Sequence, residues 1–347
     1  MKKQLLIAAV AATMTSVAMA DLSITGNGKF EYFNSQTGTA ASTNKTNTEV
    51  NLGIVGKSGD TSVVLNMEFN THGATSVTDT DTDAADTNTA GVVNTSTANN
   101  ALHIEDMYMK TKIGDVSVKA GNYASGNSAL LGEIDDGGRA TNKVTLSTSM
   151  GGADFYMGNS GAVAGASTTA INNNMFAGVS MTVAGVKVQA KKVDEDTNAF
   201  GISGDLSGVS YRYEQKSDTA ANGDVTFAQV SGKVNGIALT YAMVDADKVD
   251  KINESDSGIF AVSANGGSTT SGITQISASG SLAGNAITVK SGTVEGGLAA
   301  NSDLDFVQIK AVRSLASGAT AAITYTDKDA STTTDTETLE IDLSVKF

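Results

Sequence analysis

Apolar and polar residues alternate along most of the chain, which is the pattern of a β-strand with one apolar and one polar face. The first such stretch, residues 21–33, reads DLSITGNGKFEYF, with apolar positions at Leu22, Ile24, Phe30 and Tyr32. Residues 339–347 alternate in the same way near the other end of the sequence. A helical period of comparable length does not occur in the sequence. The pattern therefore predicts an all-β fold.

Tight turns join the predicted strands into hairpins. We predict these turns at Lys57–Asp60 and near Gly114–Asp115, Gly151–Gly152, Ala184–Gly185, Ser207–Gly208, Val234–Gly236, Gly284–Asn285 and Ser317–Gly318. One opening strand, eight hairpins and one closing strand give 18 antiparallel strands. The stretch Ile259–Ala264 could form a further strand. An odd number would place the two termini on opposite sides of the sheet, so we assign this stretch to a loop.

The remaining connections are longer and strongly polar. They are Asn34–Asn47, Thr71–Ala101, Asn159–Asn173, Val244–Ser257 and Asp327–Glu337. One end of the predicted sheet therefore has tight turns and the other has long loops. A soluble β-sandwich need not separate its loops by length in this way. A transmembrane β-barrel does so systematically, with short periplasmic turns and long external loops, and it crosses the bilayer with strands of about nine to eleven residues.

The two faces of the strands support a barrel around water. The more polar face carries Lys29, Glu31, Glu68, Lys119, Lys187, Gln189, Arg212 and Glu214. Burying such ions without partners would cost several kcal/mol each, whereas a water-filled lumen would keep them hydrated. Aromatic residues are predicted to form a girdle where ascending strands reach the outer interface, at Tyr32, Phe69, Tyr123, Tyr213, Tyr241 and Tyr325. The alternative is that these rings are ordinary strand residues.

The first 20 residues have the features of a secretory signal peptide. A positive start, Met1-Lys2-Lys3, precedes an apolar stretch that begins at Leu5, and Ala18-Met19-Ala20 supplies the small residues expected before a cleavage site. We therefore predict that residues 1–20 are removed on export and that residues 21–347 form the barrel. The mature part lacks an apolar run of about 18 residues that could form a spanning helix.

Composition excludes several classes of function. The chain has 23 Lys and Arg residues against 37 Asp and Glu residues, a net charge of −14, which argues against nucleic-acid binding. It contains no cysteine and two histidines, His72 and His103, so we predict neither a cofactor nor a metal site. The acidic run 79–86, DTDTDAAD, resembles the opening of a calcium loop, but Ala84 and Ala90 replace the glycine and the glutamate that such a loop needs.

Several segments resemble the Gram-negative general porins. Residues 21–33 resemble the first strand of that family, Leu52-Gly53-Ile54-Val55-Gly56 its second strand, and residues 104–122, IEDMYMKTKIGDVSVKAGN, its fourth and fifth strands. Phe347 is similar to the terminal aromatic residue that the barrel-assembly machinery recognises. The resemblance implies a homotrimer of 16-stranded, water-filled barrels in the outer membrane, in contact with lipid and lipopolysaccharide, through which ions and small hydrophilic solutes diffuse.

The resemblance also implies a constriction loop after the fifth strand. Residues 122–143, NYASGNSALLGEIDDGGRATNK, occupy that position and carry Glu133, Asp135, Asp136 and Arg139. Fixed charges in a narrow pore are weakly screened and so control which ions enter. The alternative is a solvated surface loop in which these charges have no specific role.

The facing wall departs from the arginine ladder that the family usually has. In that family arginine is common at the positions of Asn51, Glu105 and Asn122, and Glu49 lies near Asn51. The whole chain has three arginines, Arg139, Arg212 and Arg313. We predict a lumen wall near the constriction formed by Lys29, Glu31, Glu49, Asn51, Glu68, Glu105, Lys119 and Asn122. A weak basic wall opposite an acidic loop predicts mild cation selectivity.

Other classes of protein remain as alternatives. We do not expect an enzyme, because the sequence lacks a G-x-S-x-G turn, a P-loop and an HExxH motif. An exported surface-layer or adhesin β-protein would share the composition, but a fixed repeat period is not found. A plugged outer-membrane barrel without channel activity is the remaining alternative.

Overall fold

The computed structural model describes most of the predicted barrel. The described residues are 21–72, 100–124, 130–131, 139–159, 175–193, 196–218, 223–246, 259–261, 272–296, 303–316, 318–330 and 335–347. Within these ranges the chain forms 18 strands. Their bounds are β1 Asp21–Thr37, β2 Thr43–Ser58, β3 Thr61–His72, β4 Asn100–Ile113, β5 Val116–Ala124, β6 Arg139–Met150, β7 Ala153–Asn159, β8 Met175–Val183, β9 Val186–Lys192, β10 Thr197–Leu206, β11 Val209–Asp218, β12 Gly223–Val234, β13 Ile237–Ala246, β14 Gly272–Leu282, β15 Asn285–Glu295, β16 Leu304–Ser314, β17 Ala319–Ala330 and β18 Thr336–Lys346.

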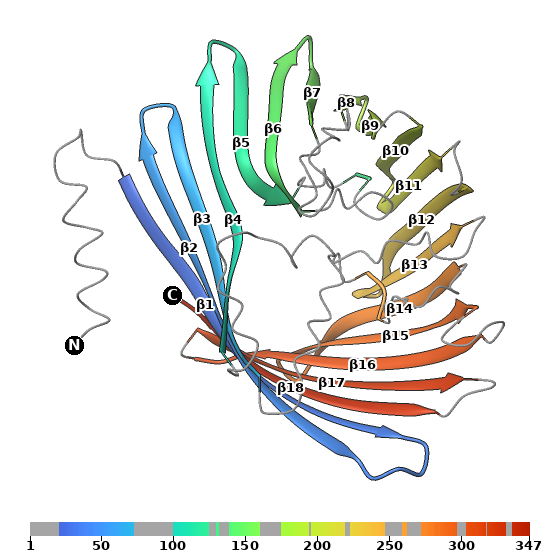
Figure 1. Cartoon of the computed structure of the whole chain (residues 1–347). Helices are drawn as coiled ribbons and strands as arrows, with labels where there is room; N and C mark the ends of the chain where they lie inside the picture. The colour runs from blue at the N-terminus through green and yellow to red at the C-terminus, as the bar shows by residue number, and fades with distance from the viewer. Residues whose placement is uncertain are drawn as a thin grey trace, which may run out of the picture.

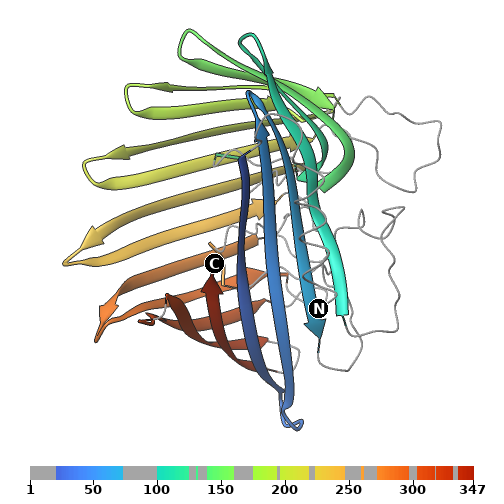
Figure 2. The ribbon, with the colours of Figure 1, turned by 90° about the vertical axis from the view of Figure 1, so that its left-hand side faces the viewer.

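The strands form one closed antiparallel sheet (Figure 1). Each strand pairs with the next in sequence, and β1 also pairs with β18, which closes the barrel. Figure 2 shows this seam, with β1 in blue beside β18 in red. The all-β barrel predicted from alternation is confirmed, and so is the count of 18 from the hairpins. The 16 strands implied by the resemblance are wrong, because β14 and β15 add a complete hairpin.

Two-residue turns set the hairpin ends. Ala184, Ser207, Asn235 and Ala283 have φ between 50° and 53°, and the glycine that follows each has φ between 79° and 84°. Two successive positive φ values define a type I′ turn, whose twist matches that of the flanking strands. The fourth of these turns is at Ala283–Gly284, one residue before its predicted place. Glycine at the second position therefore fixes where each of these hairpins reverses.

Two predicted loops are largely strand. The connection predicted at Asn34–Asn47 is shortened because β1 extends to Thr37 and β2 starts at Thr43. The connection predicted at Asp327–Glu337 is shortened in the same way by β17 and β18. Polar side chains bond across the extended hairpin, as where the Tyr32 hydroxyl donates to Asn44 Oδ1 at 2.8 Å. Polar composition predicted loops here, but a strand that extends beyond the bilayer can be polar on both faces.

The apolar face of the barrel points outward. Ile24 on β1, Met107 on β4 and Ile323 on β17 each expose about half of their surface. Their register partners share this face, as where Ile24 lies opposite Ile54. Charged residues such as Glu31 alternate with them and so face the lumen. An apolar exterior around a polar interior is the arrangement of a transmembrane barrel.

The part of the chain that the structure describes contains no helix that is both long and apolar enough to cross a membrane.

The barrel seam is completed by Phe347. Its backbone N–H donates to the carbonyl of Gly26, and the Gly26 N–H donates to the carbonyl of Phe347, both at 2.9 Å. A Cβ atom at Gly26 would lie 2.6 Å from the Phe347 ring, so the ring covers the bare backbone of that glycine. Such cover by an aromatic side chain protects a glycine within a sheet.

Candidate functional site: the inner wall of the barrel

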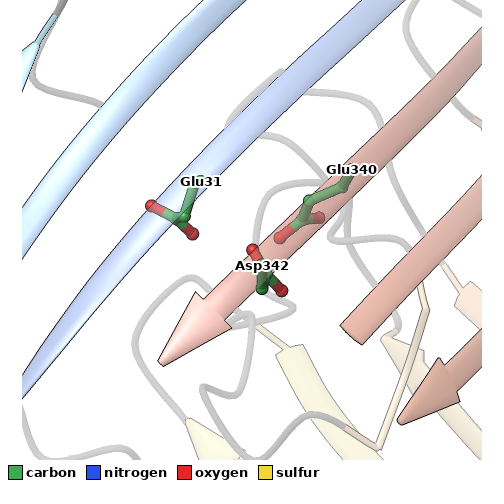
Figure 3. Close-up of side chains that lie close together, drawn as sticks. All are labelled: Glu31, Glu340 and Asp342. Atoms are coloured by element: carbon green, nitrogen blue, oxygen red, sulfur yellow. The ribbon is translucent and has the colours of Figure 1, made fainter. Parts of the chain in front are cut away.

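Three carboxylates gather on the inner face of β1 and β18 (Figure 3). Oxygen atoms of Glu31, Glu340 and Asp342 all lie within 4.8 Å of one another. Lys29 forms an ion pair with Glu31, and Asn47 Nδ2 donates to Glu31 Oε2 at 2.9 Å. The lysine balances one charge of the three, so this part of the wall attracts cations without requiring a bound metal.

The carboxylates continue across β2 and β3. Glu49 accepts a hydrogen bond from Asn51, and Glu68 accepts one from Asn70. In the register Asn51 lies opposite Glu68 and Asn70 lies opposite Glu49, so the two Glu–Asn pairs face each other. His103 on β4 lies opposite Glu68. Amide donors from asparagine thus orient the carboxylates without neutralising them.

A β-bulge adds Glu105 to this group. Asn66 pairs with Asp106 whereas Met67 pairs with Ile104, so Glu105 is the extra residue of β4. Glu105 lines a recess of about 330 Å³ together with Asn51, Asn66 and other residues of β1 to β3. Bulges re-aim side chains in this way. We call six acidic residues of this region the carboxylate wall: Glu31, Glu49, Glu68, Glu105, Glu340 and Asp342. Asp106, next to Glu105, instead accepts a hydrogen bond from Asn66.

Lys119 on β5 lies between two aromatic rings. Its Nζ is 4.0 Å from the centroid of Tyr108 and 3.9 Å from that of Tyr123. The Tyr123 hydroxyl is 2.7 Å from Thr145 Oγ1 on β6. Tyr123 is 2% exposed and lies inside the barrel, so its assignment to the outer girdle was wrong. Tyr123 is four residues from the inward Lys119 on the same strand, so alternation places both side chains on the inner face.

Asn122 lies on the opposite face from its predicted position. It pairs with Met107, whose side chain is 50% exposed on the outer surface. Gly121 precedes it with φ of 141°, and a Cβ atom at Gly121 would lie 2.3 Å from the carbonyl oxygen of Met107. Only glycine allows this close approach between the two strands. The register therefore removes Asn122 from the inner wall.

Leu130 and Leu131, which follow β5 in the sequence, lie inside the barrel. Leu130 and Leu131 are 1% and 2% exposed. A Cβ atom at Gly201 on the inner face of β10 would lie 2.7 Å from Leu130 Cγ. β7, β8 and β9 separate β6 from β10 in the sheet, so the two leucines reach a distant part of the wall. Glu133, Asp135 and Asp136 lie outside the described residues, and Arg139 begins β6 opposite Ala124.

Leu131 packs on an apolar part of the inner wall that the sequence analysis missed. We call this region the apolar shelf. It consists of inward residues near the loop ends of β10 and β12 to β16, namely Ala199, Val225, Phe227, Ala242, Val244, Ala246, Ile273, Val294, Leu304 and Phe306. Phe227 is fully buried. A sequence signal was present, because Tyr241 to Val244 is apolar on both faces of β13, as expected for a strand covered on both sides.

A second segment, Ile259–Ala261, also lies on the apolar shelf. The Gln275 side chain holds it, because Nε2 donates to the carbonyl of Ile259 and Oε1 accepts from the N–H of Ala261, both at 2.7 Å. The Phe260 ring meets the Phe227 ring edge to face, with centroids 6.3 Å apart. Assigning this stretch to a loop agrees with the structure over these three residues, but its place inside the barrel was not predicted.

Cationic side chains face the lumen below the shelf. Arg212 on β11 forms an ion pair with the buried Glu214. Lys290 on β15 lies opposite Gln308, and Lys310 on β16 lies opposite Thr288, so the two lysines are diagonal neighbours. Inward lysines such as Lys29 and Lys346 thus lie beside carboxylates on β18 and β1 to β4, whereas the inward cations of β10 to β16 lie beside the apolar shelf.

Comparisons with known proteins show the fold. No protein-family model and no curated protein matches the chain. The structure is similar to Pseudomonas aeruginosa OccK9 (OpdG), with a TM-score of 0.65, 12% identity, and coverage of 94% of this chain and 98% of that one. A BenF-like porin from Pseudomonas fluorescens Pf-5 gives a TM-score of 0.61, 12% identity, and coverage of 94% and 99%. The Pseudomonas aeruginosa outer-membrane protein opdK, also solved with vanillate, gives a TM-score of 0.62, 9% identity, and coverage of 94% of this chain and 98% of that one. The chain has the fold of outer-membrane porins.

Proposed function

We propose that the chain is an outer-membrane porin of a Gram-negative bacterium, a water-filled channel for passive diffusion of ions and small hydrophilic solutes. The observation that carries this proposal is the carboxylate wall. Its Glu and Asp side chains face the lumen from strands whose other face is apolar. Water in the lumen offsets the cost of keeping these charges away from bulk solvent. The shared fold with porin structures supports the same function. We propose no catalytic activity.

We also propose that the channel mildly prefers cations. The carboxylate wall supports this preference, since fixed negative charge raises the local concentration of cations. The proposed constriction loop, residues 122–143, would add Glu133, Asp135, Asp136 and Arg139, and the entry of Leu130 and Leu131 into the barrel supports its position. Replacing Asp135 and Asp136 with Asn should reduce cation preference. Unchanged reversal potentials would refute the role of these two aspartates.

Assembly forms a further part of the proposal. Residues 1–20 are a cleaved signal peptide, Phe347 is the residue recognised by the barrel-assembly machinery, and three copies associate in the membrane. The exposed Phe347 ring at the seam supports its accessibility to a partner. Mass measurement of the mature chain and heat-modifiable migration on gels test export and trimer formation.

Planar-bilayer recording under a KCl gradient tests the channel. We expect stepwise openings in groups of three and a reversal potential that favours potassium. Chloride preference would retain the porin and reject the proposed role of the carboxylate wall. Folded protein that gives no conductance would reject the channel.

The two inserted segments favour a second candidate, a barrel too narrow to conduct. Leu131 and Ile259–Ala261 occupy part of the lumen cross-section. A barrel of this kind would serve as an anchor or receptor. The same recording distinguishes the two candidates, because only the channel conducts.

A further inference from the structure

The segment Ile259–Ala261 is bonded to the inner wall through its backbone. It lies outside the 18 strands of the barrel, and Gln275 on β14 holds it. The Gln275 side chain donates to the carbonyl of Ile259 and accepts from the N–H of Ala261, both at 2.7 Å. One carboxamide thus pairs with a carbonyl and an N–H that flank the residue between them. Because nearly every residue of a peptide carries both groups, the same two bonds can form with other peptides.

A second carboxamide contacts the end of the segment. Gln308 Nε2 on β16 donates to the carbonyl of Ala261 at 3.3 Å. The same nitrogen donates to Thr326 Oγ1 on β17 at 3.1 Å, so β17 helps to orient this amide. Gln275 lies in the paired part of β14, between β13 and β15. Both amides therefore stand on paired strands, and the sheet rather than the segment positions them.

Aromatic rings surround the residue between the two bonds. The Phe260 ring meets the Phe227 ring edge to face, with centroids 6.3 Å apart. The Phe306 ring lies over Gly292 beside Gln275, since a Cβ atom at Gly292 would lie 2.8 Å from Phe306 Cζ and 2.9 Å from Gln275 Cα. Phe227 and Phe306 both belong to the apolar shelf. The wall thus matches an aromatic side chain that is flanked by two peptide groups.

A free peptide can reproduce each of these contacts. The hydrogen bonds use the peptide groups of the segment, and the ring contact uses a phenyl group. The segment differs from a free peptide in being tethered, which gives it a high effective concentration at the wall. A free peptide therefore binds more weakly than the wall alone would allow, because the segment occupies its place.

We propose that this part of the inner wall binds short peptides that carry an aromatic side chain, and that Ile259–Ala261 is its displaceable internal occupant. We call it the carboxamide site and define it by Gln275, Gln308, Phe227 and Phe306. The ring of the peptide lies against Phe227, and the flanking carbonyl and N–H bond to Gln275. A bound peptide moves the segment off the wall. The inference rests on the proposed water-filled lumen, from which the peptide reaches the site.

A peptide with the only tryptophan in the sample tests the proposal, because the chain contains none. Acetyl-Ile-Trp-Ala-amide is titrated with the folded protein in detergent, and its emission should shift to the blue and saturate. Acetyl-Ile-Phe-Ala-amide, which has the sequence of the segment, should reverse the shift by competition. The same competitor methylated on the alanine nitrogen lacks the N–H that bonds to Gln275. It should bind about fivefold more weakly, the contribution of one hydrogen bond.

Substitutions on the two sides of the contact should act in opposite directions. Gln275→Leu removes two hydrogen bonds and should weaken the binding of acetyl-Ile-Phe-Ala-amide about 25-fold, about fivefold for each bond. Phe260→Ala weakens the internal occupant and should strengthen binding of the peptide about fivefold, the contribution of one aromatic pair. Gln229→Leu is the matched control, because Gln229 stands in the same register row on β12, and it should leave the affinity unchanged.

Four results would overturn the proposal. They are the absence of a saturable shift with both the parent and Phe260→Ala, equal affinities of the methylated and unmethylated peptides, an affinity that survives Gln275→Leu, and a Phe260→Ala variant that binds no more tightly than the parent. The methylated peptide is measured on the parent protein, so a Gln275→Leu variant that fails to fold leaves the proposal falsifiable.

Conductance plays no part in this readout. A barrel that conducts ions but binds no peptide overturns the carboxamide site and leaves the proposed channel intact. A barrel that binds the peptide without conducting supports the carboxamide site and rejects the channel.

Discussion

The two halves of the inner wall differ in the side chains that they present to the lumen and in what covers those side chains. On β18 and β1 to β4 the carboxylate wall presents charges, and Glu31, Glu49 and Glu68 accept hydrogen bonds from asparagines of the same or the neighbouring strand. On β10 to β16 the apolar shelf presents Val, Phe and Leu side chains, which the chain covers with its own segments. The same alternation of residues produces both halves. Alternation therefore determines which side chains face inward, but not whether water or protein meets them there.

This difference separates stability from conduction. Covering the shelf removes apolar area from water and so stabilises the inserted segments. The carboxylate wall stabilises little, because hydrated charges gain modest energy from their neighbours, but it controls the potential that an ion experiences. Substitutions on the two halves should therefore affect different measurements.

The largest effect should come from Phe227→Ala on the apolar shelf. This residue is fully buried beneath Phe260, and removing a buried phenyl ring costs about 3–5 kcal/mol. Equilibrium unfolding in denaturant measures the loss of stability. Phe227→Leu is the control and should cost less than about 1.5 kcal/mol, because most of the apolar volume remains. An alanine variant as stable as the parent would show that the shelf does not stabilise the barrel.

Removing the hydrogen bonds between Gln275 and the segment Ile259–Ala261 should open the part of the lumen that this segment covers. Gln275→Leu leaves the Ile259 carbonyl and the Ala261 N–H without this partner, at about 1–3 kcal/mol for each buried group. We expect the segment to detach and single-channel conductance to rise. Gln229→Leu on the inner face of β12 is the matched control and should leave conductance unchanged. Equal conductance in both variants would contradict the role of Gln275.

Neutralising the charged half should change selectivity with little effect on folding. We expect Glu49→Gln, Glu68→Gln and Glu105→Gln to lower the potassium preference about twofold each, since a unit charge about 8 Å away in water contributes about 0.5 kcal/mol. Reversal potentials measure the change. Glu295→Gln and Glu337→Gln, on the outer face, provide the control. A similar shift in the control variants would show that net charge rather than position is responsible.

Lys310→Gln should produce the smallest change, in the opposite direction. Removing one inward cation from β16 should raise the potassium preference by about twofold or less, by the same estimate of about 0.5 kcal/mol. Arg313→Gln is the control, because Arg313 lies on the outer face near the tight turn. A fall in potassium preference would indicate that ions do not pass between the two halves.

The sequence predicts the barrel better than its contents. The residues of a turn such as Asn235–Gly236 are neighbours in the sequence and have positive φ in the structure. Their residue types alone therefore predicted the tight hairpins and, from these, the count of 18 strands. The inward assignment of Asn122 followed its place in the resemblance, whereas alternation from the inward Lys119 puts Asn122 on the outer face beside its partner Met107. The place of Ile259–Ala261 is different, since it is decided by Gln275 and Phe227 on other strands. Such long-range contacts are not encoded in alternation.

The Phe347 seam has a consequence for how the barrel folds. Gly26 and Phe347 lie near opposite ends of the printed sequence, so the bonds between them close the longest loop in the sheet. Pairings between distant residues form slowly, because the chain loses entropy before the contact repays it. Until the seam forms, β1 and β18 are both unpaired edges that can join strands of other molecules. Closure of the seam is therefore the step at which an assembly factor would most reduce aggregation.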